Sequence, residues 1–336
     1  WRRTPVPKLN RTSALQLIAG AAALLAVAGA FAQSAWRPEK AVEIVTPSAA
    51  GGSNDKVARV MQKSMQDGRL VPVPVTVVNR PGGNQTLSRL YVSQHPGDAH
   101  YFDIATPSLT GNYVMGVSPL KHTDFTPIAL LTNEYTTLTV KADSPIRNVA
   151  DLVERLKKDP ESVSIGVSNL GGTSHLTMAV AAKSAGIDPK RLKFVVFKSA
   201  SEAITSVIGG HLTMVSGSMP SVNAVVQSGS ARVLAVSAPR RLGGALATIP
   251  TLRESGVAGA GSNWRAVIGP RGLSAAQVAY WEAVFARAVQ SDIWKKAIED
   301  EGWDGAFMGS REFARFLDAE YAEYRAILGD LGLARQ

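Results

Sequence analysis

The feature that most constrains the fold is an alternation of short apolar runs with amphipathic stretches, which extends from about residue 36 to residue 236. Residues 42–45 read Val-Glu-Ile-Val, a strand-like run. After the loop that follows them, the apolar side chains of Val57, Met61 and Met65 recur at helical spacing. Strands that alternate with helices are typical of α/β folds with mainly parallel sheets. We therefore expect an α/β protein.

The alternation falls into two blocks, separated near Thr136. Beyond Pro250 the pattern changes to two long helices, at 275–289 and 311–328, with no third sheet on which to pack. We therefore expect this tail to return to the first block, so that the chain forms two lobes like a clamshell. The predicted ranges are 36–137 plus 248–336 for lobe 1, 138–247 for lobe 2, and two hinge-crossing segments near 135–142 and 236–249.

The charge of the chain excludes one class of partner. The 336 residues carry a formal net charge of +9, and Arg2, Arg3, Lys8 and Arg11 supply four of these charges, which leaves 9 − 4 = +5 for the remainder. This remainder is scattered along the sequence and not clustered, so we expect no nucleic-acid surface and only a modest preference for anionic ligands. The chain contains no cysteine, which excludes disulfides and thiol chemistry.

The N-terminal residues differ in composition from the rest. A basic stretch that ends at Arg11 precedes an uncharged apolar run from Ala14 to Ala30, and Ala-Phe-Ala stands at 30–32. This is the layout of a secretory signal peptide, which we predict at 1–32. An uncleaved membrane anchor is the alternative, although the run is short for a bilayer span. The Arg2-Arg3 pair leaves the export route open.

Two glycine-bearing loops stand where predicted strands lead into helices. The first, at 49–55, reads Ala-Ala-Gly-Gly-Ser-Asn-Asp, and the second, at 168–175, reads Ser-Asn-Leu-Gly-Gly-Thr-Ser-His. Ligands of open α/β sheets bind outside the carboxyl ends of strands, and the N–H groups of a helix start favour an anion. Each loop alone is equally compatible with a plain capped turn. Their recurrence in both blocks predicts a cleft that both loops line, with residues 106–110 as a third candidate.

Five stretches resemble the substrate-binding receptors of the tripartite tricarboxylate transporter family. They are residues 47–55, 77–83, 124–129, 249–256 and 264–270. Each is weak alone, but their order behind a signal peptide is specific, and the resemblance extends over about 36–333. It implies a monomeric periplasmic-binding-protein-like clamshell, secreted to the periplasm, with no enzymatic activity, cofactor or metal. Such a receptor delivers a small organic acid to a secondary transporter with two membrane subunits.

The resemblance also implies, position by position, which residues hold the carboxylate. The expected ligand-binding residues are Ser48, Ala50, Gly51, Gly52, Ser53, Asp55, Ser108, Ser168, Gly171, Gly172, Thr173 and Ser174. Two positions depart from the family pattern, since residue 48 is often aromatic in relatives and Thr213 stands where many have Asp. An acidic residue at 213 would suit an amino group, so its absence favours a di- or tricarboxylate without an amine.

Two other functions compete with this interpretation. A periplasmic hydrolase would need a nucleophile, a base and an acid in register. Residues 166–170 begin like a nucleophile elbow but lack the closing glycine, and the five histidines show no metal-ligand spacing. A sensor that presents its closed form to a membrane kinase would have the same pocket. The identity of the carboxylate, and contacts of His175, Lys198 or Trp264 with it, stay open.

Overall fold

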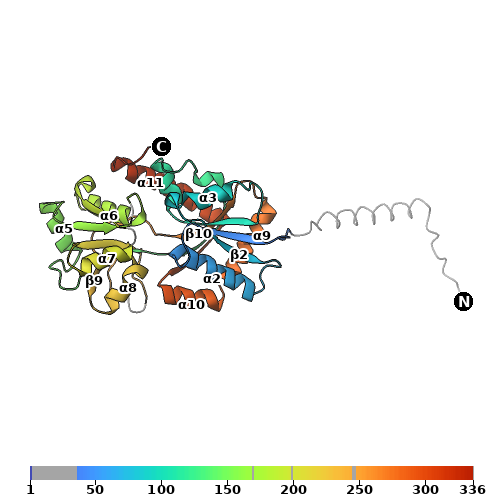
Figure 1. Ribbon diagram of the computed structural model, residues 1–336, viewed down its shortest axis with the longest axis horizontal. Helices are drawn as coiled ribbons and strands as arrows, with labels where there is room; N and C mark the ends of the chain where they lie inside the picture. Colours follow the sequence, from blue (N-terminus) through green and yellow to red (C-terminus); the bar gives the residue numbers. More distant parts are fainter. Residues whose placement is uncertain (2–35, 169, 198–199, 244–246, 336) are drawn as a thin grey trace. The chain divides into compact units, whose positions relative to one another are not determined.

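The computed structural model describes residue 1 and residues 36–168, 170–197, 200–243 and 247–335. The signal peptide predicted at 1–32 thus lies outside the described residues except for Trp1, and it stays a prediction. Residues 38–336 form one compact unit that contains two β-sheets (Figure 1). Within the described part of the chain, no helix combines the length and the apolar character that a membrane span requires.

The first sheet has six strands in the order β11-β4-β10-β3-β1-β2. Their bounds are β1 Val42–Thr46, β2 Val75–Asn79, β3 Tyr101–Ala105, β4 Phe125–Asn133, β10 Arg265–Pro270 and β11 Asp304–Gly309. Strand β1 is parallel to β2 and β3, whereas β10 is antiparallel to β3 and β4. The sheet therefore joins strands from the start of the chain to strands from its end.

The second sheet has five strands in the order β7-β6-β8-β5-β9. Their bounds are β5 Thr136–Lys141, β6 Ser164–Val167, β7 Lys193–Val196, β8 Met214–Ser218 and β9 Ala231–Val236. Strand β6 is parallel to β7 and β8, and β5 is antiparallel to β8 and β9. The α/β class is confirmed. The expectation of mainly parallel sheets is wrong, because strands that enter a lobe from the other lobe run against the strands built by local βα crossovers.

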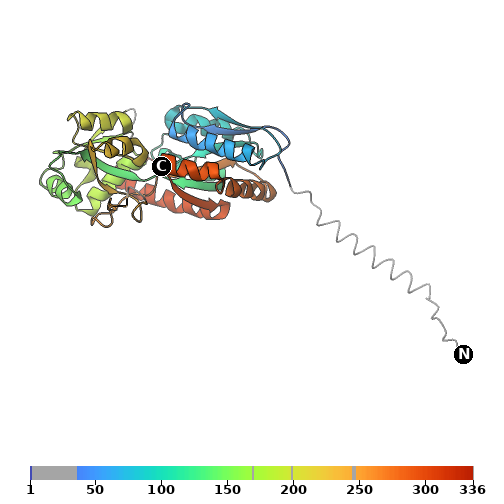
Figure 2. The same cartoon turned by 90° about the horizontal axis from the view of Figure 1, so that it is seen from below.

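Helices accompany both sheets (Figures 1 and 2). Their bounds are α2 Ser53–Asp67, α3 Thr86–Ser93, α4 Ser108–Val114, α5 Val149–Lys158, α6 Thr173–Ser184, α7 Ala200–Ile208, α8 Met219–Gln227, α9 Ala275–Ala288, α10 Asp292–Glu301 and α11 Ser310–Asp330. Both views show the blue and cyan segments from the start of the described chain beside the orange and red segments from its end. The C-terminal helices thus lie with the first sheet.

Aromatic side chains attach these C-terminal helices to the first sheet. Trp281 of α9 is fully buried and packs edge-on against Phe102 of β3, with ring centroids 4.8 Å apart. Phe313 and Leu317 of α11 share an apolar cluster with Trp264. Complete burial of a side chain of this kind stabilises the fold by about 1.5–3 kcal/mol relative to an exposed position. The predicted apolar stripe of the last helix is therefore a packing face.

Two segments cross between the sheets. One joins β4 to β5 through Glu134, and the other returns through Asn263 to β10; the backbones of these two residues pair, with N···O distances of 3.2 and 2.8 Å. Leu252 and Val257 belong to the apolar cluster of the second sheet, and Thr251 bridges to β9. The chain therefore stays with the second sheet up to about residue 257.

Candidate functional site

The first glycine turn joins β1 to α2, and its shape is held by one carboxylate. Gly51 adopts a left-handed conformation with φ +80°, and its N–H donates to Asp55 Oδ2 at 2.8 Å. The same carboxylate accepts from Arg59 Nε at 2.8 Å and from Asn79 Nδ2 at 2.7 Å. Burial opposes ionisation of Asp55, but the hydrogen bonds from Arg59, Gly51 and Asn79 outweigh it and hold its pKa below the usual value. Asp55, almost fully buried, thus shapes the turn from within.

The second glycine turn joins β6 to α6 and has the same construction. Gly171 has φ +73°, and its N–H donates to His175 Nδ1 at 3.0 Å. His175 is buried, and burial lowers its pKa to about 4, so the imidazole is neutral and Nδ1 is an acceptor. The structure therefore gives His175 the role that Asp55 has in the first turn.

The two turns correspond residue by residue. In each, a left-handed glycine precedes an extended glycine that stands at the N-cap, and the fourth residue after the first glycine accepts its N–H. Neither N-cap glycine has a side chain to cap its helix, so the first N–H groups of α2 and α6 need other acceptors. One of these N–H groups is already satisfied, because Asp55 N donates to Ser48 Oγ at 3.1 Å.

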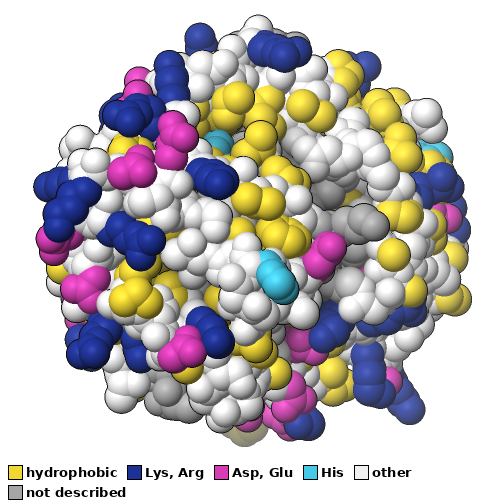
Figure 3. Space-filling model, turned by 60° about the vertical axis from the view of Figure 1, so that its left-hand side comes forward, with side chains coloured by type: hydrophobic (Ala, Val, Ile, Leu, Met, Phe, Trp, Pro, Cys, Tyr) yellow, Lys and Arg dark blue, Asp and Glu magenta, His cyan; other side chains and the backbone are white. Residues whose placement is uncertain are grey.

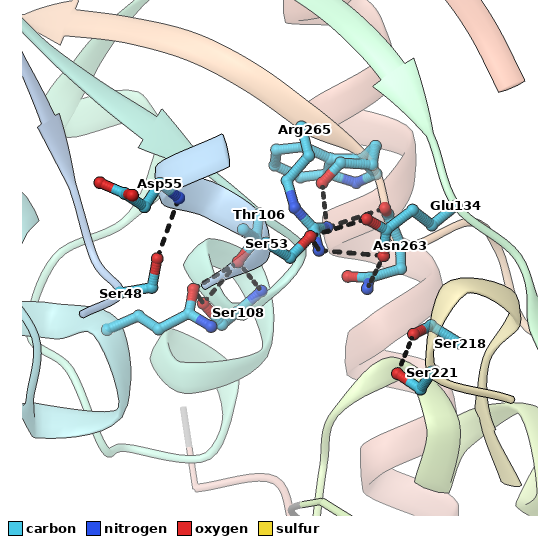
Figure 4. A network of polar contacts seen from close by, with 12 residues as sticks. Ser48, Ser53, Asp55, Thr106, Ser108, Glu134, Ser218, Ser221, Asn263 and Arg265 are labelled. Atoms are coloured by element: carbon cyan, nitrogen blue, oxygen red, sulfur yellow. Dashed lines mark hydrogen bonds and ion pairs between the residues drawn. The ribbon is translucent and has the colours of Figure 1, made fainter. Parts of the chain in front are cut away.

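A buried ion pair connects the first turn to the crossing segments (Figure 4). Arg265 and Glu134 lie 3.1 Å apart with side chains 5% and 2% exposed. Ser53 Oγ donates to Glu134 Oε1 at 2.8 Å and accepts from Arg265 Nη2 at 3.2 Å. The hydroxyl at the start of α2 is thus fixed to both crossing segments.

The third candidate segment follows β3. Ser108 Oγ accepts from Arg89 Nη2 at 2.7 Å and lies 2.8 Å from Thr106 Oγ1. Both hydroxyls lie within hydrogen-bonding distance of Gln85 Oε1, at 2.7 Å for Thr106 and 2.9 Å for Ser108. Ser108 is half-buried, and its hydroxyl group lies in the same region as Ser48 and Ser53 (Figure 4).

The second turn also contacts helices that belong with the first sheet. A Cβ placed on Gly171 would lie 2.2 Å from Met115 Sδ, just after α4, and a Cβ on Gly111 would lie 3.3 Å from Gly171 O. Leu176 of α6 shares a buried apolar cluster with Val114 of α4 and Tyr324 of α11. The absence of a side chain at Gly171 is therefore what allows this approach.

The predicted ligand-binding residues differ in how much surface they present. Those that are exposed are Ala50, Gly51, Ser53 and Ser168, those that are half-buried are Ser48, Gly52, Ser108, Gly172 and Ser174, and those that are buried are Asp55, Gly171 and Thr173. Lys198 and Asn169 lie outside the described residues. Trp264 is fully buried and donates through Nε1 to Glu320, so it packs between elements.

Sequence reasoning did not single out Ser218 and Ser221, whose hydroxyl oxygens lie 2.8 Å apart where β8 leads into α8. Figure 4 shows them on the other side of the network from Ser48 and Ser108. The available signal was an apolar run at Met214-Val215 followed by a serine and by Pro220, a residue favoured in the first turn of a helix. Gln85 and Arg89, which contact Ser108, were not predicted from the sequence either.

The surface carries mixed charges on one face and a cavity beside the crossing segments. On the face drawn in Figure 3, Lys and Arg side chains are interspersed with Asp and Glu and do not gather in one basic patch. A cavity of about 760 Å³ lies beside the crossing segments, lined by Tyr135, Arg253 and residues 256–262 among others. None of the predicted ligand-binding residues lines it.

The chain has two sheets joined by two crossing segments, and each sheet carries a glycine turn at the start of a helix. This arrangement is that of the class of two-lobed solute-binding receptors. The family model described as "Tripartite tricarboxylate transporter family receptor" matches residues 57–333, and the chain belongs to this family. The predicted resemblance to this family and the predicted periplasmic-binding-protein-like fold are confirmed.

Individual relatives agree with this assignment. The "UPF0065 protein in gbd 5'region" of Cupriavidus necator is 26% identical over 323 residues, which cover 95% of this chain and 96% of that one. A TctC solute-binding protein from Polaromonas, solved without ligand, superposes with a TM-score of 0.76 at 24% identity over 88% of this chain and 99% of its own. R. palustris Rpa4515, solved with adipate, superposes with a TM-score of 0.75 at 26% identity over the same shares.

Proposed function

We propose that this receptor binds a small di- or tricarboxylate between its two lobes and delivers it to a membrane transporter. The observation that carries the proposal is the pair of matching glycine turns, one from each sheet, each of which opens a helix whose N-cap residue is a glycine without a capping side chain. The N–H groups of such a helix start are suited to an anion. The adipate bound to the 26% identical relative from R. palustris supports a carboxylate as the ligand.

Neutral donors are sufficient for this task. Three cations that contact predicted residues within the described chain are already paired, Arg59 with Asp55, Arg265 with Glu134 and Arg89 with Asp103. A hydrogen bond to a charged group contributes about 1.5–3 kcal/mol net. Several such bonds, less the cost of ordering, reach the roughly −8 kcal/mol of micromolar binding. We propose as ligand contacts the residues predicted from the sequence, with Asp55 acting through the shape of its turn, and we add Ser218 and Ser221.

The division into lobes stays a prediction, and we propose one change to it. Because Leu252 and Val257 pack with the second sheet, the return crossing is better placed at 258–264 than at 236–249. Closure of the lobes about the two crossing segments would bring both glycine turns onto one ligand. Because the ligand binds the closed state more tightly than the open state, it favours the closed state. We further propose export to the periplasm by the signal peptide, a monomeric state, two membrane subunits as partners, and no enzymatic activity, cofactor or metal.

A thermal-shift screen of organic acids tests the ligand class. We expect di- or tricarboxylates to raise the melting temperature and the corresponding neutral amides to leave it unchanged, since only a ligand of the native state stabilises it. A panel of carboxylates with no effect would contradict the proposal. Deletion of the gene, followed by uptake and transcription measurements with the acid that binds, separates transport from the sensor alternative.

A further inference from the structure

A buried ion pair lies directly behind Ser108. Arg89 of α3 and Asp103 of β3 are 1% and 0% exposed, and Arg89 Nε lies 3.6 Å from Asp103 Oδ2. This distance allows charge attraction but exceeds that of a hydrogen bond. The pair is therefore loosely joined, although a buried guanidinium needs close partners.

The one hydrogen bond that the Arg89 side chain makes within the described chain points toward the predicted site. Its Nη2 donates to Ser108 Oγ at 2.7 Å, while its Nε and Nη1 have no hydrogen-bond acceptor among the described residues. Only the Ser108 hydroxyl thus separates the guanidinium from the proposed ligand, and the opposite charge, Asp103, lies on the Nε side of the guanidinium. The positive end of the pair is directed at Ser108.

The hydrogen bonds around Ser108 orient its hydroxyl group as a donor. Since Ser108 Oγ accepts from Arg89, its own proton is free to be donated to Gln85 Oε1, to Thr106 or to a ligand oxygen. Gln85 is held in a left-handed conformation with φ +71°, which is uncommon for a residue other than glycine. Backbone strain of this kind collects at functional sites. The side-chain oxygen of Gln85 holds this residue against the two hydroxyls by accepting from both.

We propose that Arg89 is a positioning residue that makes the ligand site selective for anions, acting through Ser108, and that Asp103 weakens this selectivity by opposing the charge. This inference rests on the proposed function, because it names what distinguishes a carboxylate from its neutral analogue at that same site. The ion pair acts on the site as an oriented dipole whose strength depends on both partners.

The two partners of the pair then have opposite effects on binding. Asp103→Asn removes the opposing charge and keeps the shape of the side chain, so carboxylate affinity rises. Arg89→Met with Asp103→Leu removes both charges without leaving either one buried alone, so carboxylate affinity falls. One charge near 8 Å from the ligand, in a medium of effective dielectric constant about 20 to 40, changes affinity by roughly five- to thirty-fold. A purely structural role would make both changes weaken binding.

The test is calorimetric titration of the full chain and these two variants with adipate and other dicarboxylates, and with adipamide as the neutral probe. We expect Asp103→Asn to tighten dicarboxylate binding at least about fivefold, the double variant to weaken it by a smaller factor because the effects of two opposite charges partly cancel, and Arg89→Lys to retain most of the wild-type affinity. Equal affinities in wild type and double variant, or weaker binding in both variants, would overturn the inference and leave the proposed function standing. Failure of the wild type to bind any carboxylate would overturn the proposed function itself.

Discussion

The contact between the second glycine turn and α4 leads to a quantitative prediction for Gly171→Ala. The new Cβ would lie 2.2 Å from Met115 Sδ and 2.5 Å from Met115 Cε, whereas carbon contacts are optimal near 3.5–4.0 Å. Met115 must therefore shift by more than 1 Å, but Sδ and Cε are the flexible end of a half-buried side chain, so this overpacking costs about 1 kcal/mol, the low end of the usual range. The left-handed φ of +73° adds about 1–2 kcal/mol for any residue with a Cβ.

Gly186→Ala is a matched control for this variant. Gly186 has φ +77°, follows α6 on the surface of the same lobe, and a Cβ there would meet nothing within 4 Å. We expect Gly186→Ala to lower the free energy of unfolding by the backbone cost of about 1–2 kcal/mol alone, and Gly171→Ala to lower it by about 2–3 kcal/mol. Urea denaturation followed by circular dichroism measures both.

A double-mutant cycle isolates the steric part of the effect. In a Met115→Ala background the new methyl group has room, so Gly171→Ala should there cost no more than Gly186→Ala. Equal destabilisation by the two glycine variants in the wild-type background would refute the reasoning, since it would show that the second turn does not pack against Met115.

Two further predictions concern buried charges. Burial raises the pKa of Glu320 from 4.5 to about 8. The contribution of Glu320 to stability is therefore fully present below pH 4.5 and is lost as the pH rises through 8. Denaturation curves between pH 5 and 9 should show this decline, on the order of a few kcal/mol, in the wild type and not in Glu320→Gln. Arg265→Met and Glu134→Met should each lower the free energy of unfolding by about 3–5 kcal/mol, while the double variant should lose clearly less than the sum of the two. Strict additivity would mean that the pair does not interact.

The elements that local periodicity describes were predictable. The run at 42–45 corresponds to β1, Val42–Thr46, and the stripe at 311–328 to α11, Ser310–Asp330. Strand β11 reads Asp-Gly-Ala-Phe-Met-Gly, and glycine and aspartate are depleted in strands, so nothing local identified it. Its place is set by pairing with β4, which is more than 150 residues away in the sequence.

The candidate site was predictable only in part, for a similar reason. Glycine pairs before helix starts are local signals, and they located both turns. The acceptors that shape them, Asp55 and His175, are different residue types, so their common role became visible only in three dimensions. Arg89 and Asp103 look like ordinary surface charges in the sequence, because burial and pairing between α3 and β3 depend on tertiary contacts.

The most direct measurement is calorimetric titration of Gly52→Trp with whichever carboxylate stabilises the wild type. A Cβ at Gly52 already lies 3.0 Å from Ser48 Cβ and 3.1 Å from the Ala49 carbonyl oxygen, so an indole ring there must displace Ser48 and distort the first turn. We predict that this variant keeps the circular dichroism spectrum of the wild type and loses carboxylate binding, whereas Gly210→Trp, at a turn where a Cβ meets nothing within 4 Å, retains it. A folded Gly52→Trp variant with unchanged affinity would contradict the claim that the glycine turns hold the ligand.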